Sequence, residues 1–123
     1  DGLILLPGCA DVYSPKTLRA SMGAVFRRPV WACTALELRA ALDRSGLPLY
    51  GAALRQDTQD ARRMDFSRCA VAIGSEGRGL TQELLHLCHG TVRIPMSPRC
   101  ESLNAAVAAS VLLWEAYRCE EGE

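Results

Sequence analysis

The chain has 123 residues and a net charge of zero, from 14 basic and 14 acidic side chains. This length fits one domain that can bury a core without a metal or a disulfide, and a hydrophobic content of 49% excludes a disordered chain. The balanced charge disfavours a strongly basic nucleic-acid binder. No apolar run approaches the roughly 20 residues of a membrane span, and no basic segment precedes the apolar start as in a signal peptide.

The six cysteines are scattered without a C-x-x-C pair, which favours a reduced cytoplasmic protein over a disulfide scaffold. His86, Cys88 and His89 do not share one helix face, so we expect no metal site. Lys16 is the only lysine, and the other basic residues are all arginine. Recognition of phosphate by arginine and the codon usage of a GC-rich genome explain this bias equally well.

The first half of the chain alternates apolar strands with helices that carry clear end signals. Ser14 is an N-cap followed by proline, and Gly23 ends that helix. Thr34 and Glu37 form a capping box, in which each side chain bonds the other's backbone N–H. The predicted elements are a buried strand at 3–6, a helix at 15–22, a strand at 29–33, a helix from 34 to about 46, and a strand at 48–54.

The second half continues the alternation after a polar segment, 55–67, that we predict to be a loop because it has no clear period. Thr81 caps one helix, and Ser102 is predicted to cap the last helix, with Asn104 in its first turn. The other predicted elements are strands at 69–74 and 91–95 and a final helix at 105–117. Apolar strands that alternate with helices are typical of an α/β fold with a mostly parallel sheet and helices on both faces.

Three glycines gather in the loop that follows the fourth predicted strand. In "IGSEGRGL" (73–80), Gly74, Gly77 and Gly79 permit positive φ and close approach of the backbone to a ligand. The spacing matches neither the dinucleotide fingerprint nor a P-loop, and the Glu76 carboxylate would repel phosphate. A nucleotide-phosphate site is therefore disfavoured, while an ordinary tight turn with a solvated glutamate stays open.

A second polar loop, "IPMSPRCESLN" (94–104), joins the last predicted strand to the last helix. Pro95 and Pro98 fix its path. Ser102 and Asn104 lie at a helix start, where backbone N–H groups favour an anion. N-capping would explain Ser102 alone. Ligands of such folds bind beyond the carboxyl ends of the strands, so the other residues of this loop are candidates for a functional role.

Together, "AIGSEGRGL" (72–80) and "IPMSPRCESLNAAVAASVLLWEAY" (94–117) closely resemble two motifs of the SpoU-type (TrmH-like) RNA ribose 2′-O-methyltransferases of the SPOUT class. "SPKTLRASMGAVFRRPV" (14–30) is similar to the segment that links the family's first and second motifs. The motifs stand in the family's order and spacing, and the resemblance covers nearly the whole chain.

The resemblance implies an α/β domain with a C-terminal trefoil knot, a rare exception to the usual rules of topology. It also implies S-adenosylmethionine as cofactor, bound in the knotted loops mainly through backbone atoms. The expected partners are rRNA or tRNA and a second copy of the chain, with the active site near the dimer interface and with no metal or membrane. We expect the last helix, which carries a strip of alanines beside Val107, Val111 and Trp114, to form the dimer contact.

The resemblance also assigns site residues, motif by motif. The ribose 2′-hydroxyl is a weak nucleophile that needs orientation and removal of its proton, and Ser102 and Asn104 would orient the ribose or Glu76. The cofactor-binding positions are Gly74, Ile94 and Leu103, and the polar active-site positions are Glu76, Ser102 and Asn104.

One part of the family pattern is not found. The family's first motif supplies an Asn and an Arg near the reacting hydroxyl and would precede "GLILL" (2–6), but the chain starts at Asp1. We therefore expect residues 1–123 to be the catalytic domain without its first motif and without an N-terminal RNA-binding domain. Such a chain would bind the cofactor weakly and transfer no methyl group. The alternative is a non-catalytic module for cofactor binding and dimerisation in a larger or degenerate RNA-binding protein.

Overall fold

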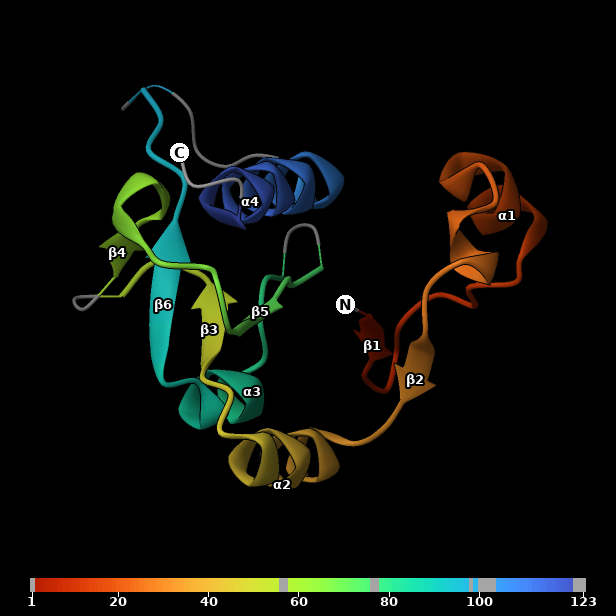
Figure 1. Cartoon of the computed structure of the whole chain (residues 1–123), viewed down its shortest axis with the longest axis horizontal. Coiled ribbons are helices and arrows are strands. Elements are labelled where there is room, and N and C mark those ends of the chain that lie inside the picture. Colours follow the sequence, from red (N-terminus) through yellow and green to blue (C-terminus); the bar gives the residue numbers. More distant parts are fainter. Residues whose placement is uncertain (1, 56–57, 76–77, 98, 100–103, 121–123) are drawn as a thin grey trace. The chain divides into compact units, whose positions relative to one another are not determined.

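The computed structural model describes residues 2–55, 58–75, 78–97, 99 and 104–120 (Figure 1). The chain divides into two compact units, Asp1–Ala41 and Leu42–Glu123. Among the described residues, no helix combines the length and the apolar character that a membrane span requires.

The first unit contains two strands and a capped helix near the predicted positions, and its strands form a small parallel sheet of their own, whereas one sheet was predicted for the whole chain. The elements are β1 (Leu3–Leu5), α1 (Pro15–Ser21), the 3₁₀ helix η1 (Ala24–Phe26) and β2 (Val30–Ala32), and β1 pairs with β2 in parallel. The Ser14 hydroxyl accepts a hydrogen bond from the Thr17 backbone N–H at 3.3 Å. Within this unit Leu3 is 49% exposed and β1 pairs with β2, so the burial of this strand stays a prediction.

Helix α2 (Ala35–Ser45) begins with the predicted capping box. The Thr34 backbone N–H donates to Glu37 Oε1 at 2.9 Å, and the Glu37 backbone N–H donates to Thr34 Oγ1 at 3.1 Å. Leu38 and Leu42, one turn apart, are buried. Gly46 adopts φ 68° directly after the helix, as expected for a glycine that ends it.

The second unit is built on a four-stranded, wholly parallel sheet in the order β4-β6-β3-β5 (Figure 1). Every strand pair in it is parallel, which confirms the predicted parallel α/β fold. The strands are β3 (Leu49–Ala52), β4 (Gln59–Asp60), β5 (Ala70–Ala72) and β6 (Gly90–Arg93).

Helices cover both faces of this sheet. Alternate residues of β3 point to opposite faces, and a Cβ on Gly51 would lie 2.7 Å from Leu80 Cδ1 and 3.0 Å from Cys88 Sγ, so this face packs on α3 (Gln82–Leu87) and its flanks. On the other face, Tyr50 packs against a buried cluster that includes Leu112 of α4 (Ala105–Glu120). The members of this cluster are Ala61, Met64, Phe66, Val92 and Leu112.

The segment 55–67 is more ordered than the sequence analysis predicted. It contains β4 and the 3₁₀ helix η2 (Ala61–Arg63), and it supplies Ala61, Met64 and Phe66 to the core. The prediction of a plain loop was wrong because three apolar side chains are enough to anchor the segment, although polar residues outnumber them. Its position is further fixed by a hydrogen bond of 2.7 Å between the hydroxyls of Thr58 and Thr91, the latter fully buried.

Candidate functional site

Both predicted ligand loops leave from the same edge of the sheet. Ala72 on β5 and Val92 on β6 each lie opposite residues 51–52 of β3, which runs between them. Since neighbouring strands are about 4.8 Å apart, the loops that start at Ile73 and Ile94 begin roughly 10 Å from each other. The carboxyl end of β3 lies between them, so the topology forms one candidate site from two distant stretches of sequence.

The first loop closes into a tight turn of the main chain. The Gly79 N–H donates to the Ser75 carbonyl oxygen at 2.9 Å, and these two residues form an antiparallel bridge. A Cβ on Gly74 would lie 2.5 Å from the Leu80 backbone nitrogen, closer than real Cβ atoms come to such a neighbour. Gly79 adopts φ 68°, a conformation that favours glycine. This part of the site is therefore made of backbone, which suits a ligand bound through main-chain atoms.

The second loop is anchored at both ends. Ile94 packs against the core cluster. At the far end, Asn104 Oδ1 accepts hydrogen bonds from the backbone N–H groups of Ala106 at 2.8 Å and Val107 at 3.4 Å, which makes Asn104 the N-cap of α4. This corrects the prediction that Ser102 caps the helix with Asn104 in its first turn. Either side chain has a capping oxygen, and the cap falls to Asn104 because α4 begins at Ala105.

The six residues assigned by the resemblance divide into two groups. Gly74, Ile94 and Asn104 lie in or beside the two loops at the carboxyl edge of the sheet. Glu76, Ser102 and Leu103 lie outside the described residues, so their positions and roles stay predictions. Asn104 is exposed and therefore accessible to a ligand as well as to the helix that it caps.

The carboxyl end of β3 is a part of this edge that the sequence analysis did not single out. The Ala53 N–H donates to the Val92 carbonyl oxygen at 3.2 Å, which extends the ladder between β3 and β6 toward the two loops. Ala52 packs against the core cluster, and Ala53 follows it at the end of the strand. The two alanines are visible in the sequence, but only the strand order shows that they lie between the glycine loop (73–80) and Ile94.

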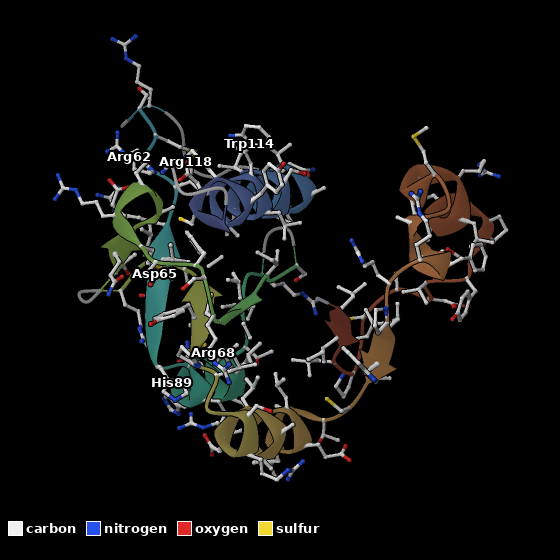
Figure 2. All side chains as sticks on the ribbon, in the orientation of Figure 1. Arg62, Asp65, Arg68, His89, Trp114 and Arg118 are labelled. Atoms are coloured by element: carbon white, nitrogen blue, oxygen red, sulfur yellow. The ribbon has the colours of Figure 1, made fainter. Side chains whose placement is uncertain are left out.

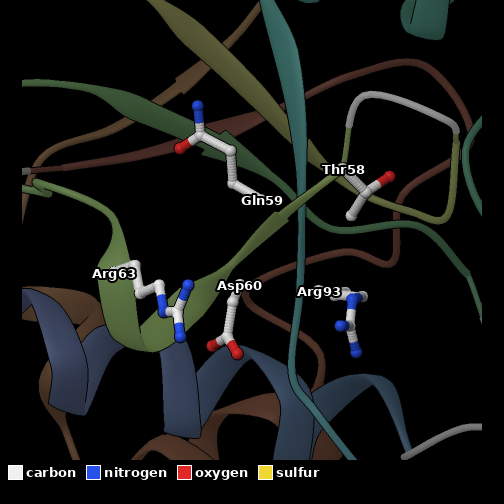
Figure 3. A pocket seen from close by; sticks show the side chains of 5 residues that line it. All are labelled: Thr58, Gln59, Asp60, Arg63 and Arg93. Atoms are coloured by element: carbon white, nitrogen blue, oxygen red, sulfur yellow. The ribbon is translucent and has the colours of Figure 1, made fainter.

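An open pocket of about 600 Å³ lies on the other side of β6, along its pairing with β4 (Figure 3). One of its lining residues, Arg93, directly precedes Ile94 in the chain. The lining is polar and charged, and it consists of Thr58, Gln59, Asp60, Arg63 and Arg93. The sequence analysis missed this pocket because it placed most of these residues in a structureless loop.

The carboxylate in this pocket, Asp60, already accepts hydrogen bonds from a neighbouring arginine. Asp60 accepts hydrogen bonds from Arg62 Nη2 at 2.7 Å, from Arg62 Nε at 3.1 Å and from the Arg62 backbone N–H at 2.9 Å. These bonds, with smaller contributions from the charges of Arg62 and Arg93, lower the pKa of Asp60 to about 2. Asp60 is therefore ionised near neutral pH and directed toward Arg62.

A further ion pair lies within α4, and the charge of its carboxylate acts on Arg62 of η2. Arg118 Nη2 lies 2.9 Å from Glu115 Oε2, and the pKa of Arg62 is raised chiefly by its hydrogen bonds to Asp60 and also by the charge of Glu115. Figure 2 shows Arg62 and Arg118 at neighbouring ends of these two elements. The arginines of this region are thus partly paired and partly open to solvent.

His89 has a structural task at the opposite end of the sheet. The ring nitrogen Nδ1 of His89 accepts a hydrogen bond from the Leu49 backbone N–H at 3.0 Å, and the backbone N–H of His89 donates to the Leu49 carbonyl oxygen at 2.7 Å. The imidazole thus fixes the start of β3 beside the start of β6. Across the residues that the structure describes, no group of three His, Cys, Asp or Glu side chains is arranged to hold a metal ion.

Comparison with known proteins identifies the family. The model of the SpoU rRNA Methylase family matches residues 1–114. A tRNA/rRNA methyltransferase of Synechocystis is 40% identical over 120 residues, which cover 96% of this chain and 43% of that protein. The chain belongs to the SpoU rRNA Methylase family.

Other relatives agree in sequence and in structure. The tRNA (guanosine(18)-2′-O)-methyltransferase of Thermus thermophilus is 42% identical over 78 residues, which cover 63% of this chain and 40% of that protein. The SpoU methyltransferase AviRb of Streptomyces viridochromogenes, solved in complex with AdoMet, matches with 35% identity and a TM-score of 0.88 over 99% of this chain and 51% of that one. The chain spans less than half the length of the curated relatives named here.

Proposed function

We propose that this chain is the core of an enzyme that methylates ribose 2′-hydroxyls of rRNA or tRNA with S-adenosylmethionine as donor. The observation that carries the proposal is that β5 and β6 flank β3 in one parallel sheet, so that the glycine loop (73–80) and the loop 94–104 both start at the carboxyl ends of these strands. These are the two stretches in which the sequence carries the family's motifs, and a family relative with a very similar fold has been solved with AdoMet.

The described part of the edge fits S-adenosylmethionine. The Gly74 turn offers backbone, and the partly buried Ile94 gives an apolar surface next to it. Such a lining holds a ligand by main-chain hydrogen bonds and shape, as small-molecule sites commonly do. Gly74, Ile94 and Leu103 are the proposed cofactor-binding residues, and the bound cofactor would supply an electrophilic methyl group.

The polar residues then act on the RNA. The ribose O2′ must form a bond to the methyl carbon while the carbon–sulfur bond breaks, and the hydroxyl proton must leave. Asn104, exposed at the start of α4, would hold the ribose in line with its amide, and Ser102 and Glu76 would orient it and assist removal of the proton. These three are the proposed catalytic residues, and the first-motif Asn and Arg of the family would complete the set.

A homodimer through α4 is part of the proposal. Leu112 faces the core, while the opposite side of the helix leaves Leu113 70%, Trp114 63% and Tyr117 53% exposed. The ring centroids of Trp114 and Tyr117 lie 6.0 Å apart, so the two rings form one apolar surface, and Figure 2 shows Trp114 on α4. A continuous apolar helix face of this kind suits a two-fold interface between identical chains.

The C-terminal trefoil knot and a cytoplasmic location complete the proposal. The knot would be formed by the segment from Ile94 into α4, of which residues 98 and 100–103 lie outside the described residues. Membership of the family supports the knot, and the scattered cysteines, without a C-x-x-C pair in the sequence, support a reducing compartment.

Methyl transfer from radiolabelled S-adenosylmethionine to ribosomal and transfer RNA tests the function in the protein that carries this chain. Parent protein is compared with Glu76→Gln, which removes the charge at nearly constant shape. Labelled 2′-O-methylnucleotides after digestion of the RNA support the enzyme. Tight cofactor binding by calorimetry with no label in either RNA would favour the non-catalytic module instead.

Sedimentation velocity tests the dimer. Leu113→Glu places a charge in the proposed interface. Gln82→Glu, at an exposed position of α3, adds the same charge outside it. We expect a dimer for the parent and for Gln82→Glu and a monomer for Leu113→Glu. A parent protein that sediments as a monomer at tens of micromolar, roughly where a specific interface persists, would rule the dimer out.

A further inference from the structure

Two arginines meet at the open pocket beside the Ile94 loop. Arg93 ends β6, and Arg63 ends η2, which directly follows the partner strand β4. Both line the same pocket, and Figure 3 shows their guanidinium groups on either side of the Asp60 carboxylate. Both residues are exposed. A ligand from solvent can therefore reach both.

The side chains that line this pocket carry a net positive charge. Arg63 and Arg93 line the pocket together with one carboxylate, Asp60, which accepts hydrogen bonds from Arg62. Within the described part of the chain, the guanidinium groups of Arg63 and Arg93 make no hydrogen bond. The lining itself holds two cations, Arg63 and Arg93, and one anion, Asp60, which leaves a net charge of one positive unit, so the pocket is suited to an anion.

We propose that Arg63 and Arg93 form a phosphate subsite for the RNA backbone next to the nucleotide that is methylated. A guanidinium presents a planar fork of donors that matches two phosphate oxygens, and charge-assisted bonds of this kind are strong and directional. The subsite rests on the proposed function, because it takes the RNA to be the substrate of the neighbouring loops.

The position of the pocket supports a backbone contact rather than a base contact. Arg93 directly precedes Ile94, and β4 is one strand spacing of about 4.8 Å beyond β6. A nucleotide adjacent to the target ribose therefore reaches the pocket without a large bend. The pocket is shallow and lined by polar groups, with no aromatic ring on which a base could stack. Contacts to phosphate fix register and orientation without reading sequence.

The dependence of RNA binding on salt tests the subsite. The probes are bulk transfer RNA and fragmented ribosomal RNA, labelled with a fluorophore and followed by anisotropy across a range of potassium chloride concentrations. The proteins are the parent, Arg63→Gln, Arg93→Gln, the double variant, the double lysine variant and Arg44→Gln. Arg44 is an exposed arginine in the last turn of α2, away from this pocket, so its variant controls for loss of one charge.

Each glutamine substitution in the pocket should reduce the slope of log affinity against log salt by about 1, and the double variant by about 2. The double lysine variant should keep the slope of the parent with weaker affinity at every salt concentration, because charge remains and the fork is lost. Calorimetric affinity for S-adenosylmethionine should stay unchanged in all of them.

Two results would overturn the subsite alone. In the first, the pocket variants have the same salt slope as Arg44→Gln, while the parent binds and methylates RNA. In the second, inorganic phosphate binds saturably and needs both arginines, but the RNA slope does not change in the variants. The second result would identify a free-anion pocket. A parent protein that binds the cofactor but neither RNA would overturn the proposed function together with the subsite.

Discussion

The side-chain oxygen of Asn104 lies 2.8 Å from the backbone nitrogen of Ala106. The residue that the family motif places in the active site is therefore also the N-cap of α4. A cap needs only an oxygen, whereas orientation of a ribose uses the amide as a donor as well. Substitutions that keep the oxygen and remove the amide can separate the two roles.

Asn104→Ser should keep most of the stability, and Asn104→Ala should lower the free energy of unfolding by about 1 kcal/mol. In the full-length protein that carries this chain, both should reduce methyl transfer by roughly 10²-fold if the amide contacts the reacting groups. Urea unfolding and initial rates with labelled cofactor give the two readouts. A serine variant as active as the parent would show that Asn104 is only a cap.

Gly74→Ala should open the first loop, because the new Cβ would overlap the backbone of Gly79 and Leu80. We expect a loss of stability of about 1–3 kcal/mol and a clear loss of cofactor affinity by calorimetry. Gly90→Ala is the matched control, since a Cβ there would lie 3.4 Å from the Tyr50 ring, an ordinary contact. Unchanged cofactor affinity in Gly74→Ala would exclude this turn from the cofactor site.

His89→Phe should destabilise the protein by about 1–3 kcal/mol, because the buried Leu49 N–H loses its acceptor. His89→Asn offers a side-chain oxygen in a similar place and should recover part of this loss. Thermal and urea unfolding measure both variants. Equal stabilities for the phenylalanine and asparagine variants would show that the ring fills space there and that its nitrogen is not needed.

Asp60 should make the stability depend on pH in acid. Its pKa is about 2 in the folded chain against an ordinary value of 3.8, so its contribution is present above about pH 4 and is lost as the pH falls toward 2. Asp60→Asn should be less stable than the parent at neutral pH, and the difference should shrink across that window. Urea unfolding at a series of pH values measures it.

Other carboxylates define the background of that experiment. The pKa values of Glu37 and Asp65 are also lowered, chiefly by the backbone N–H groups of Thr34 and Ser67. The parent and Asp60→Asn both retain these two carboxylates, so some loss of stability in acid should remain after Asp60→Asn. A constant difference between parent and Asp60→Asn from pH 6 to pH 2 would contradict the assignment to Asp60.

The sequence predicted most helix and strand positions because their signals are local. Ser14, Thr34 with Glu37, and Thr81 each bond a backbone N–H within three residues, so their effect is readable in a short window. Strand β4 was missed because it is two residues long and exists only through its pairing with β6, more than thirty residues away.

The candidate site was predictable in its parts and not in its arrangement. The two loops stand out by their glycines and prolines, but their closeness depends on the strand order, with β3 between β5 and β6. Arg63 and Arg93 looked unrelated for the same reason: thirty residues separate them, and the register of β4 on β6 brings them to one pocket. Pairing across a sheet is set by the whole core, which no local pattern records.

The exposure of Trp114 on α4 gives the protein an optical reporter. The chain has two tryptophans, Trp31 on β2 in the first unit and Trp114 in the second. Trp31→Phe therefore leaves a single indole, which is 63% exposed in the isolated chain. Association of two copies through α4 would take this indole out of water and shift its fluorescence to shorter wavelength as protein concentration rises. Assembly can then be followed in dilute solution, without any attached dye.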